Sequence, residues 1–176
     1  MSTPDKDAHV YFNLMAKDEK AQLPHYPRGT ACYARAQHTA KFLIENGRDV
    51  ELIWALGTIN NFVPNIPNVD WEKGMAAHVA VLDKETGLVY DQAFCREPVD
   101  RKRWENLFLP GRADGIRPRI ETSGLNTVVR KHHNEPRLFQ ASPEIMAKEV
   151  ETAVHLTLSN HKPQIIERIG NDFIYA

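Results

Sequence analysis

The sequence lacks any apolar stretch near the roughly 20 residues that a membrane-spanning helix needs. It also lacks an excess of charge of either sign, since 22 Lys and Arg stand against 23 Asp and Glu, for a formal net charge of -1. A nearly neutral chain has no overall electrostatic attraction to nucleic acid or to an anionic membrane. We therefore expect neither a nucleic acid nor a membrane among its partners.

Cysteine is scarce as well, because the chain contains only Cys32 and Cys95. This is too few for a disulfide scaffold, although one bridge between the two is possible. Neither cysteine belongs to a CxxC motif or lies near an HxxxH motif, so we expect no zinc site. The sequence predicts no metal and no organic cofactor.

The first residues, Met1 to Asp7, lack the charged and then apolar pattern of a secretory signal peptide. We expect a protein that is cytoplasmic or that is exported by a signal-independent secretion system. With 176 residues, of which 42% are hydrophobic and 26% charged, the chain has the size and composition of one soluble globular domain over 1–176. The core is most clearly predicted over 29–94.

The predicted fold class is α+β, with a helix packed on an antiparallel sheet. Apolar residues recur at helical spacing from Ala31 to Asn46, where Thr30 can cap the beginning and Gly47 can end the helix in a left-handed conformation. A second helix is expected from Ser142 to Ser159, because Ser-Pro is a typical helix start. The expected strands, by alternation and β-branched content, are 50–56, 77–82, 88–92, 116–120 and 126–130, with a short strand or helical turn at 10–15 and another at 165–169.

The segments 57–74 and, apart from its two short strands, 95–140 are expected to be irregular. The long Asn- and Pro-containing loop 57–74 has no periodicity, and such loops often form the rim of a functional site. Residues 96–119 carry several arginines and are interpreted as a mildly basic, solvated surface.

Cys32 is the leading candidate for a nucleophile, because it lies at the beginning of the predicted helix. A free thiol with a pKa near ~8.5 is only slightly ionised at neutral pH. The partial positive charge of a helix N-terminus and a neighbouring imidazolium both lower that pKa. The unpaired N–H groups of the first turn can also stabilise an oxyanion.

His78 and Asp91 are the candidates for base and orienting carboxylate. If the turn between their strands occupies 83–86, so that Leu82 pairs with Gly87, His78 lies directly opposite Asp91. A carboxylate in that position fixes the imidazole tautomer and stabilises its charged form. The order Cys, His, Asp along the chain is that of papain-like and transglutaminase-like catalytic triads.

Each residue also has an ordinary structural interpretation: a core cysteine, a satisfied histidine, a turn aspartate. Other histidines are weaker candidates for the site. His38 lies about 240° around the helix from Cys32 and points away from it, whereas His25 could border the site. His132 and His133 form a charged cluster with Arg130 and Lys131 that we expect to be solvated, and His155 lies within the second helix.

Three segments resemble the bacterial protein-glutaminase family: Cys-Tyr-Ala-Arg-Ala at 32–36, His-Val-Ala-Val-Leu at 78–82 and Val-Tyr-Asp-Gln-Ala-Phe at 89–94. In that family the first segment carries the nucleophile, the second the histidine and the third the aspartate. Gln92 and Ala93 replace the Pro-containing step that follows the family's aspartate. The absence of a signal and pro-segment would suit an effector delivered into another cell.

The resemblance implies a papain/transglutaminase-like core and deamidation of glutamine in a protein substrate. It assigns Cys32 as nucleophile, His78 as general base and acid, and Asp91 as the orienting carboxylate. Trp54, Phe62, Trp71 and the loop 57–74 are candidates for the cleft that receives the glutamine.

Two alternatives remain open from the sequence. The same triad could serve a transglutaminase-like acyltransferase or a papain-like cysteine protease. The chain could also be a non-catalytic binding domain in which the three residues are structural.

Overall fold

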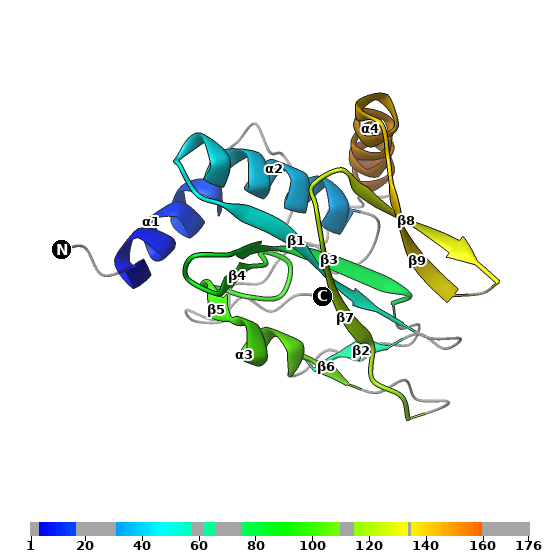
Figure 1. The fold of residues 1–176 in the computed structure, drawn as a ribbon, viewed down its shortest axis with the longest axis horizontal. Helices are drawn as coiled ribbons and strands as arrows, with labels where there is room; N and C mark the ends of the chain where they lie inside the picture. The colour runs from blue at the N-terminus through cyan, green and yellow to red at the C-terminus, as the bar shows by residue number, and fades with distance from the viewer. Residues whose placement is uncertain are drawn as a thin grey trace.

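The computed structural model describes residues 4–16, 31–57, 62–65, 75–109, 115–133 and 135–159. The expectations for Thr30, His25, Trp71 and 165–169 lie outside these ranges. Within them the structure is mixed, with few helices and a central antiparallel sheet (Figure 1). The helices are α1 (Pro4–Ala16), α2 (Ala31–Glu45), α3 (Arg101–Glu105) and α4 (Pro143–Ser159).

The main sheet has five strands in the order β5-β4-β3-β1-β7, and all of its pairs are antiparallel. Two further strand pairs, β2-β6 and β8-β9, lie outside it. The strands are β1 (Val50–Leu56), β2 (Val63–Pro64), β3 (Ala77–Asp83), β4 (Leu88–Tyr90), β5 (Val99–Asp100), β6 (Phe108–Leu109), β7 (Arg119–Ser123), β8 (Thr127–His132) and β9 (Glu135–Gln140).

The two faces of the sheet are covered by different elements. Leu52 and Trp54 of β1 pack with α1 and α2, whereas Ile53 and Ala55 pack with Trp104 of α3 and its neighbours. This alternation is the one that the sequence predicts for β1. The helix beginning at Ala31 is confirmed, and Gly47 follows it with φ 78°, the left-handed conformation expected there.

The structure corrects the expectation for 10–15, since α1 is a helix of 13 residues. Ala8, Tyr11 and Phe12 face inward at helical spacing, while Val10 and Leu14 are 53% and 50% exposed. The helix packs on α2, where Tyr11 meets the ring of Phe42. The apolar face is therefore formed by residues at that spacing and not by the contiguous run 10–15.

The expectation of irregular structure over 57–74 and 95–140 is wrong in part. β2 lies within the first segment and pairs with β6, which follows α3 in the second. The predicted strand 126–130 is found as β8, whereas the strand predicted at 116–120 begins three residues later, as β7. The sequence does not predict β9.

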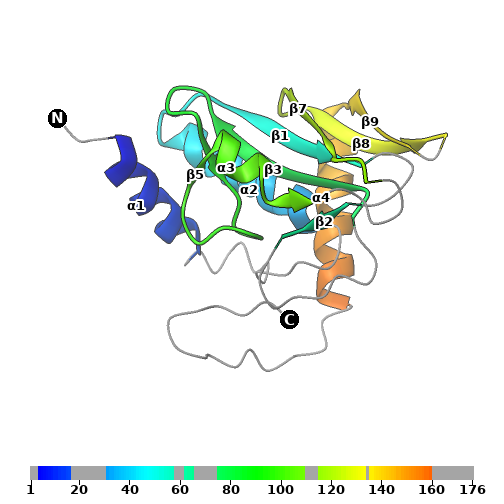
Figure 2. The ribbon, with the colours of Figure 1, turned by 90° about the horizontal axis from the view of Figure 1, so that it is seen from below.

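At one end of the molecule, opposite α1, the β8–β9 hairpin and α4 lie together (Figures 1 and 2). The helix α4 also packs beside α2, which carries Cys32. Among the described helices, none is long and apolar enough to span a membrane.

Candidate active site

The turn between β3 and β4 differs from the prediction and still brings the candidate residues together. Leu82 pairs with Val89 instead of Gly87, a displacement of two residues. Asp83 remains in β3, its carboxylate accepts hydrogen bonds from the N–H groups of Glu85 and Thr86, and Gly87 closes the turn with φ 72°. Because side chains alternate with period two, this displacement keeps Asp91 on the predicted face.

His78 and Asp91 are therefore diagonal neighbours and not directly opposed, and the expected direct opposition is wrong. Their side chains still meet, with His78 Nε2 2.8 Å from Asp91 Oδ2. Both residues are buried, at 2% and 3% exposure. A carboxylate buried against an imidazole favours the charged form of that ring.

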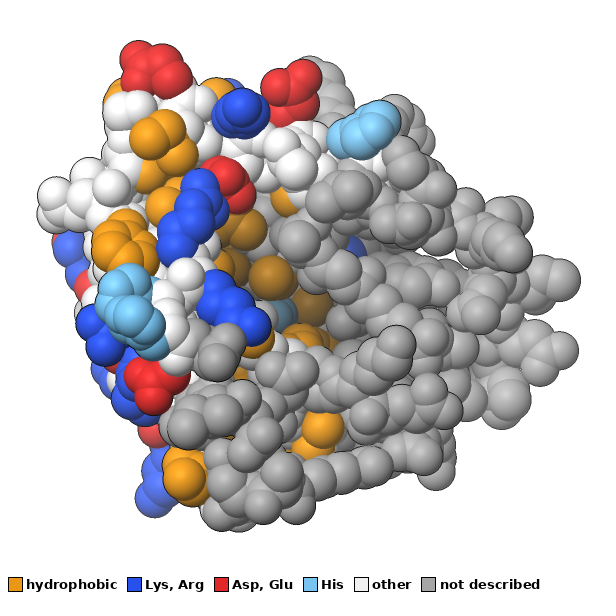
Figure 3. All heavy atoms as spheres, turned by 90° about the vertical axis from the view of Figure 1, so that its right-hand side faces the viewer, with side chains coloured by type: hydrophobic (Ala, Val, Ile, Leu, Met, Phe, Trp, Pro, Cys, Tyr) orange, Lys and Arg blue, Asp and Glu red, His pale blue; other side chains and the backbone are white. Residues whose placement is uncertain are grey.

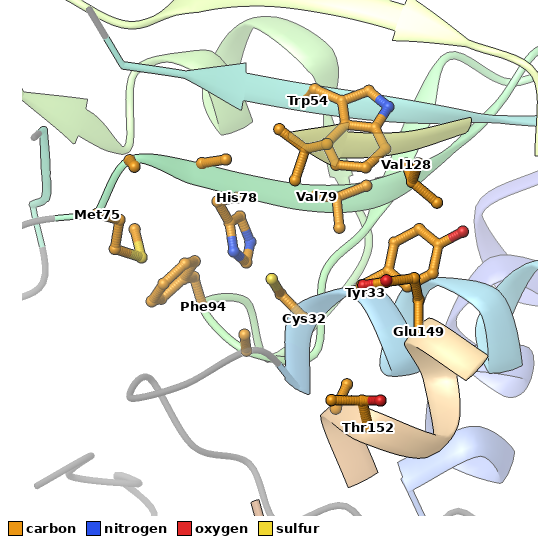
Figure 4. A pocket seen from close by; sticks show the side chains of 15 residues that line it. Cys32, Tyr33, Trp54, Met75, His78, Val79, Phe94, Val128, Glu149 and Thr152 are labelled. Carbon is orange, nitrogen blue, oxygen red and sulfur yellow. The ribbon is translucent and has the colours of Figure 1, made fainter. Parts of the chain in front are cut away.

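Cys32 reaches this pair at an open edge of β3. In the observed register β4 pairs with β3 through Val81 and Leu82, so the first residues of β3 extend beyond their neighbour. The thiol of Cys32 lies there, at the beginning of α2, close enough to the His78 side chain and to the Val79 backbone for both to lower its pKa. Figure 4 shows the sulfur pointing at the His78 ring. Since Nε2 is bonded to Asp91, Nδ1 is the ring nitrogen left for the thiol.

These contacts shift the pKa values of Cys32 and His78. Burial alone raises the pKa of the Cys32 thiol, but the hydrogen bond and charge of His78, the charge of Arg35 and the Val79 contact bring it below its ordinary value. Burial lowers the pKa of His78, but the charge and hydrogen bond of Asp91 together with Cys32 raise it to about 9. The arrangement therefore favours a thiolate beside an imidazolium at neutral pH.

Two further groups hold the Asp91 carboxylate. Trp104 Nε1 donates to Oδ2 at 2.7 Å, and the Ala93 N–H donates to Oδ1 at 3.0 Å. Burial raises the pKa of this carboxyl, but His78 and these two donors hold it below its ordinary value. Asp91 is thus kept ionised beneath the imidazole.

Aromatic rings enclose the imidazole of His78. Phe94 lies at a centroid distance of 4.5 Å, Phe108 at 5.8 Å and Trp104 at 6.2 Å. Sequence reasoning missed Trp104, since the segment containing it was interpreted as basic surface. The available signal was Asp100, which caps α3 and so places Trp104 against Asp91.

Cys32 and His78 open into a cavity of about 370 Å³ with mainly apolar walls. Figure 3 shows it as a hollow with hydrophobic side chains at its base. One wall comes from the triad region and from β1, and the opposite wall comes from β8 and α4. The lining residues are Cys32, Tyr33, Trp54, Met75, Ala76, Ala77, His78, Val79, Ala93, Phe94, Val128, Val129, Glu149, Thr152 and Ala153.

The other residues that the sequence offers as candidates lie partly in the cavity wall and partly elsewhere. Trp54 lines the cavity while also being buried in the core, whereas Phe62 is buried at 1% exposure on the other face of the sheet and does not line the cavity. Cys95 is a free, buried thiol whose pKa is raised by burial and by the charge of Asp91. His38 and His155 are also not among the described residues that line the cavity.

Comparison with known proteins relates this chain to glutaminases by sequence and by fold. Residues 8–108 match the model of the glutaminase family. A search of curated proteins found no significant match. The fold is similar to the NMR structure of protein-glutaminase from Chryseobacterium proteolyticum, with a TM-score of 0.60 and 18% identity over 94% of each chain.

Two crystal structures are similar to the same extent. One is of protein-glutaminase, with a TM-score of 0.60 and 18% identity over 92% of each chain. The other is of the A47Q2 mutant of pro-protein-glutaminase, with a TM-score of 0.61 and 18% identity over 91% of this chain and 60% of that one. At these identities the similarity shows a shared fold. Because the family model spans more than half of the sequence, the chain belongs to the glutaminase family and is an enzyme of the deamidase class.

Proposed function

We propose that this enzyme deamidates glutamine side chains of proteins through a Cys32–His78–Asp91 triad, with α2 as the nucleophile helix of a papain/transglutaminase-like core. The observation that carries the proposal is the unbroken chain of contacts from the Cys32 sulfur through His78 to Asp91, at the base of an apolar cavity. A glutamine side chain entering this cavity brings its carboxamide to the thiol. Among the described residues, no three or more His, Cys, Asp or Glu side chains are grouped so that they could hold a metal ion.

In the first step the Cys32 thiolate attacks the carboxamide carbon and forms a tetrahedral intermediate. Its oxyanion is held by unpaired backbone N–H groups at the beginning of α2. The His78 imidazolium gives its proton to the departing amine, so ammonia leaves and a γ-glutamyl thioester remains.

In the second step neutral His78 takes a proton from water, which attacks the thioester. The products are the restored Cys32 thiolate, with one proton of the water on His78, and a glutamic acid side chain, which gives its own proton to the solvent and becomes glutamate. Asp91 stays ionised throughout and stabilises the charged ring between the two steps.

The test is incubation with a glutamine-containing protein, followed by ammonia measurement and intact-mass spectrometry. Deamidation adds about one dalton for each glutamine converted, whereas transamidation joins two chains and proteolysis cuts one. We expect ammonia release and the mass gain without cleavage or cross-linking. Cleaved or joined products without the mass gain would instead identify a protease or a transglutaminase.

The matched variants are Cys32→Ser and Cys95→Ser, which make the same substitution at the two cysteines of the chain. We expect Cys32→Ser to abolish ammonia release with its fold retained, and Cys95→Ser to keep most of the activity. An active Cys32→Ser enzyme would remove this thiol from the mechanism.

A further inference from the structure

We infer that the β8–β9 hairpin is a docking surface for an acidic segment of the protein substrate beside its target glutamine. This inference rests on the proposed function and adds a substrate class to it. The surface, here called the hairpin face, consists of Val128, Arg130, Arg137 and Phe139. These residues lie beyond the family-model match at 8–108.

The register of the hairpin places these four side chains on one side. Val128 pairs with Phe139, and Arg130 pairs with Arg137. Directly opposed residues of two paired strands point to the same face, and so do residues two apart along one strand. Val128 is buried and lines the cavity. The hairpin face therefore begins at the cavity wall and continues outward from it.

A second contact joins the hairpin face to the cavity. Arg130 Nη2 lies 2.6 Å from Oε1 of Glu149, and Glu149 of α4 lines the cavity as well. Figure 3 shows Lys, Arg and His side chains gathered beside the hollow. A polypeptide that flanks a bound glutamine on this side of the cavity would therefore meet positive charge.

The composition of the hairpin face is unfavourable for a surface that only meets water. Two arginines directly opposite one another on neighbouring strands destabilise the pair. Glu149 compensates Arg130, but Arg137 makes no ion pair with any residue that the structure describes. Phe139 remains 43% exposed beside it. Arginine and exposed aromatic residues are enriched in binding surfaces.

The charge of the hairpin identifies the partner. On this face of the hairpin the charged side chains are Arg130 and Arg137, against the single carboxylate of Glu135, whereas Lys131 lies on the other face. An extended polypeptide spans ~3.3–3.6 Å per residue, so Asp or Glu a few positions from the glutamine can reach charges beside the cavity. A nucleic acid is disfavoured, since the whole chain has a formal net charge of -1 and the cavity is apolar.

The experiment compares three peptides with one glutamine in the same context, flanked by acidic, neutral or basic residues. The kcat/KM for ammonia release should be highest for the acidic peptide, and salt should reduce its advantage. Arg137→Gln should reduce the acidic-to-neutral ratio about two- to five-fold, the size of one exposed ion pair. Arg137→Glu should bring that ratio below one.

The control is Lys102→Gln, which removes the same charge from exposed α3, away from the hairpin (Figure 1). It should leave the ratio unchanged, and an equal fall in this variant would overturn the inference by showing an effect of net charge alone. Thermal unfolding should show no loss of stability in Arg137→Gln, because a repulsion is removed.

The outcomes separate the two proposals. Equal turnover of the three peptides by the unmodified enzyme overturns the docking surface and leaves deamidation intact. No turnover of any peptide or protein overturns the proposed function itself. Stronger inhibition by a single-stranded oligonucleotide than by poly-glutamate would assign the hairpin face to nucleic acid and overturn the inference as well.

Discussion

Ionisable side chains in a protein interior are costly unless each has a partner. The buried His78 and Asp91 and the half-buried Cys32 meet this requirement through one another. The residue that completes the set is Trp104, whose indole N–H bonds the Asp91 carboxylate. With the N–H of Ala93 on the other oxygen, the carboxylate has little freedom to rotate. The direction in which it presents its charge to His78 is thereby fixed.

Trp104 is accordingly expected to be a positioning residue. Trp104→Phe removes a hydrogen bond to a charged group and should lower kcat about ten-fold with little change in KM. Trp54→Phe is the comparison, because Trp54 donates its indole N–H to Ser123 Oγ at 2.8 Å instead. Since Trp54 lines the cavity, its substitution should change KM and not kcat. Both variants should lose some stability, and steady-state kinetics should show the fall in kcat only in Trp104→Phe. Equal kcat losses would argue against a specific role for the Asp91 contact.

The pH dependence of activity follows from the directions of the two pKa shifts. The thiolate–imidazolium pair exists between the lowered pKa of Cys32 and the pKa of His78, which is about 9. The profile of kcat/KM should therefore fall on its alkaline side near pH 9. Asp91→Asn removes the charge that raises the His78 pKa, so its alkaline limb should move to lower pH. An unchanged limb in this variant would show that another group sets it.

At the scale of the elements, the sequence predicts α2, β1 and α4 well because each has a clear apolar periodicity or cap. The predicted β3–β4 register differs from the observed one by two residues, because Gly87 fits the end of a turn as well as the first position of a strand. Only the carboxylate of Asp83, which caps the turn, decides between the two. The face of Asp91 was predicted correctly because side-chain direction depends on odd or even displacement alone.

The short helix α3 could not be predicted, because five residues carry no measurable periodicity. It depends on its cap, since the Asp100 side chain accepts a hydrogen bond from the Arg103 N–H at 2.9 Å. Asp100→Ala should cost about 1 kcal/mol, or roughly 2–4 °C in Tm, and should lower activity by loosening Trp104. Asp100→Asn should restore both, since Asn caps helices equally well. A variant whose Tm is unchanged would exclude a role for this cap.

At the scale of the whole molecule, the site lies where separate parts of the fold meet. The triad comes from α2, β3 and the end of β4, whereas the opposite cavity wall comes from β8 and α4. Sequence reasoning found the first group because its residues are reactive types in a recognisable order. It could not find the second, because Val128, Thr152 and Ala153 are ordinary residues whose role arises from tertiary packing alone.

The stability of the fold should depend on acid through Asp91. Its pKa is lower in the folded chain than the ~3.9 of an unfolded one, so its contribution is present above about pH 4 and is lost as the pH falls through the folded value. Asp91→Asn should be about 1–3 kcal/mol less stable at pH 7. Denaturant unfolding should also show a smaller loss of stability on acidification in this variant. A parallel loss in both proteins would mean that Asp91 is not a main source of acid sensitivity.

The most direct measurement of the central claim is the rate of iodoacetamide alkylation of each cysteine against pH, followed by peptide mass spectrometry. Cys32 should label well below pH 8, while Cys95, with its raised pKa and burial, serves as the unreactive internal control. His78→Ala should move the labelling of Cys32 to higher pH. If Cys32 labels only above pH 8, or labels identically without His78, then the thiol is not activated by the imidazole and the account is contradicted.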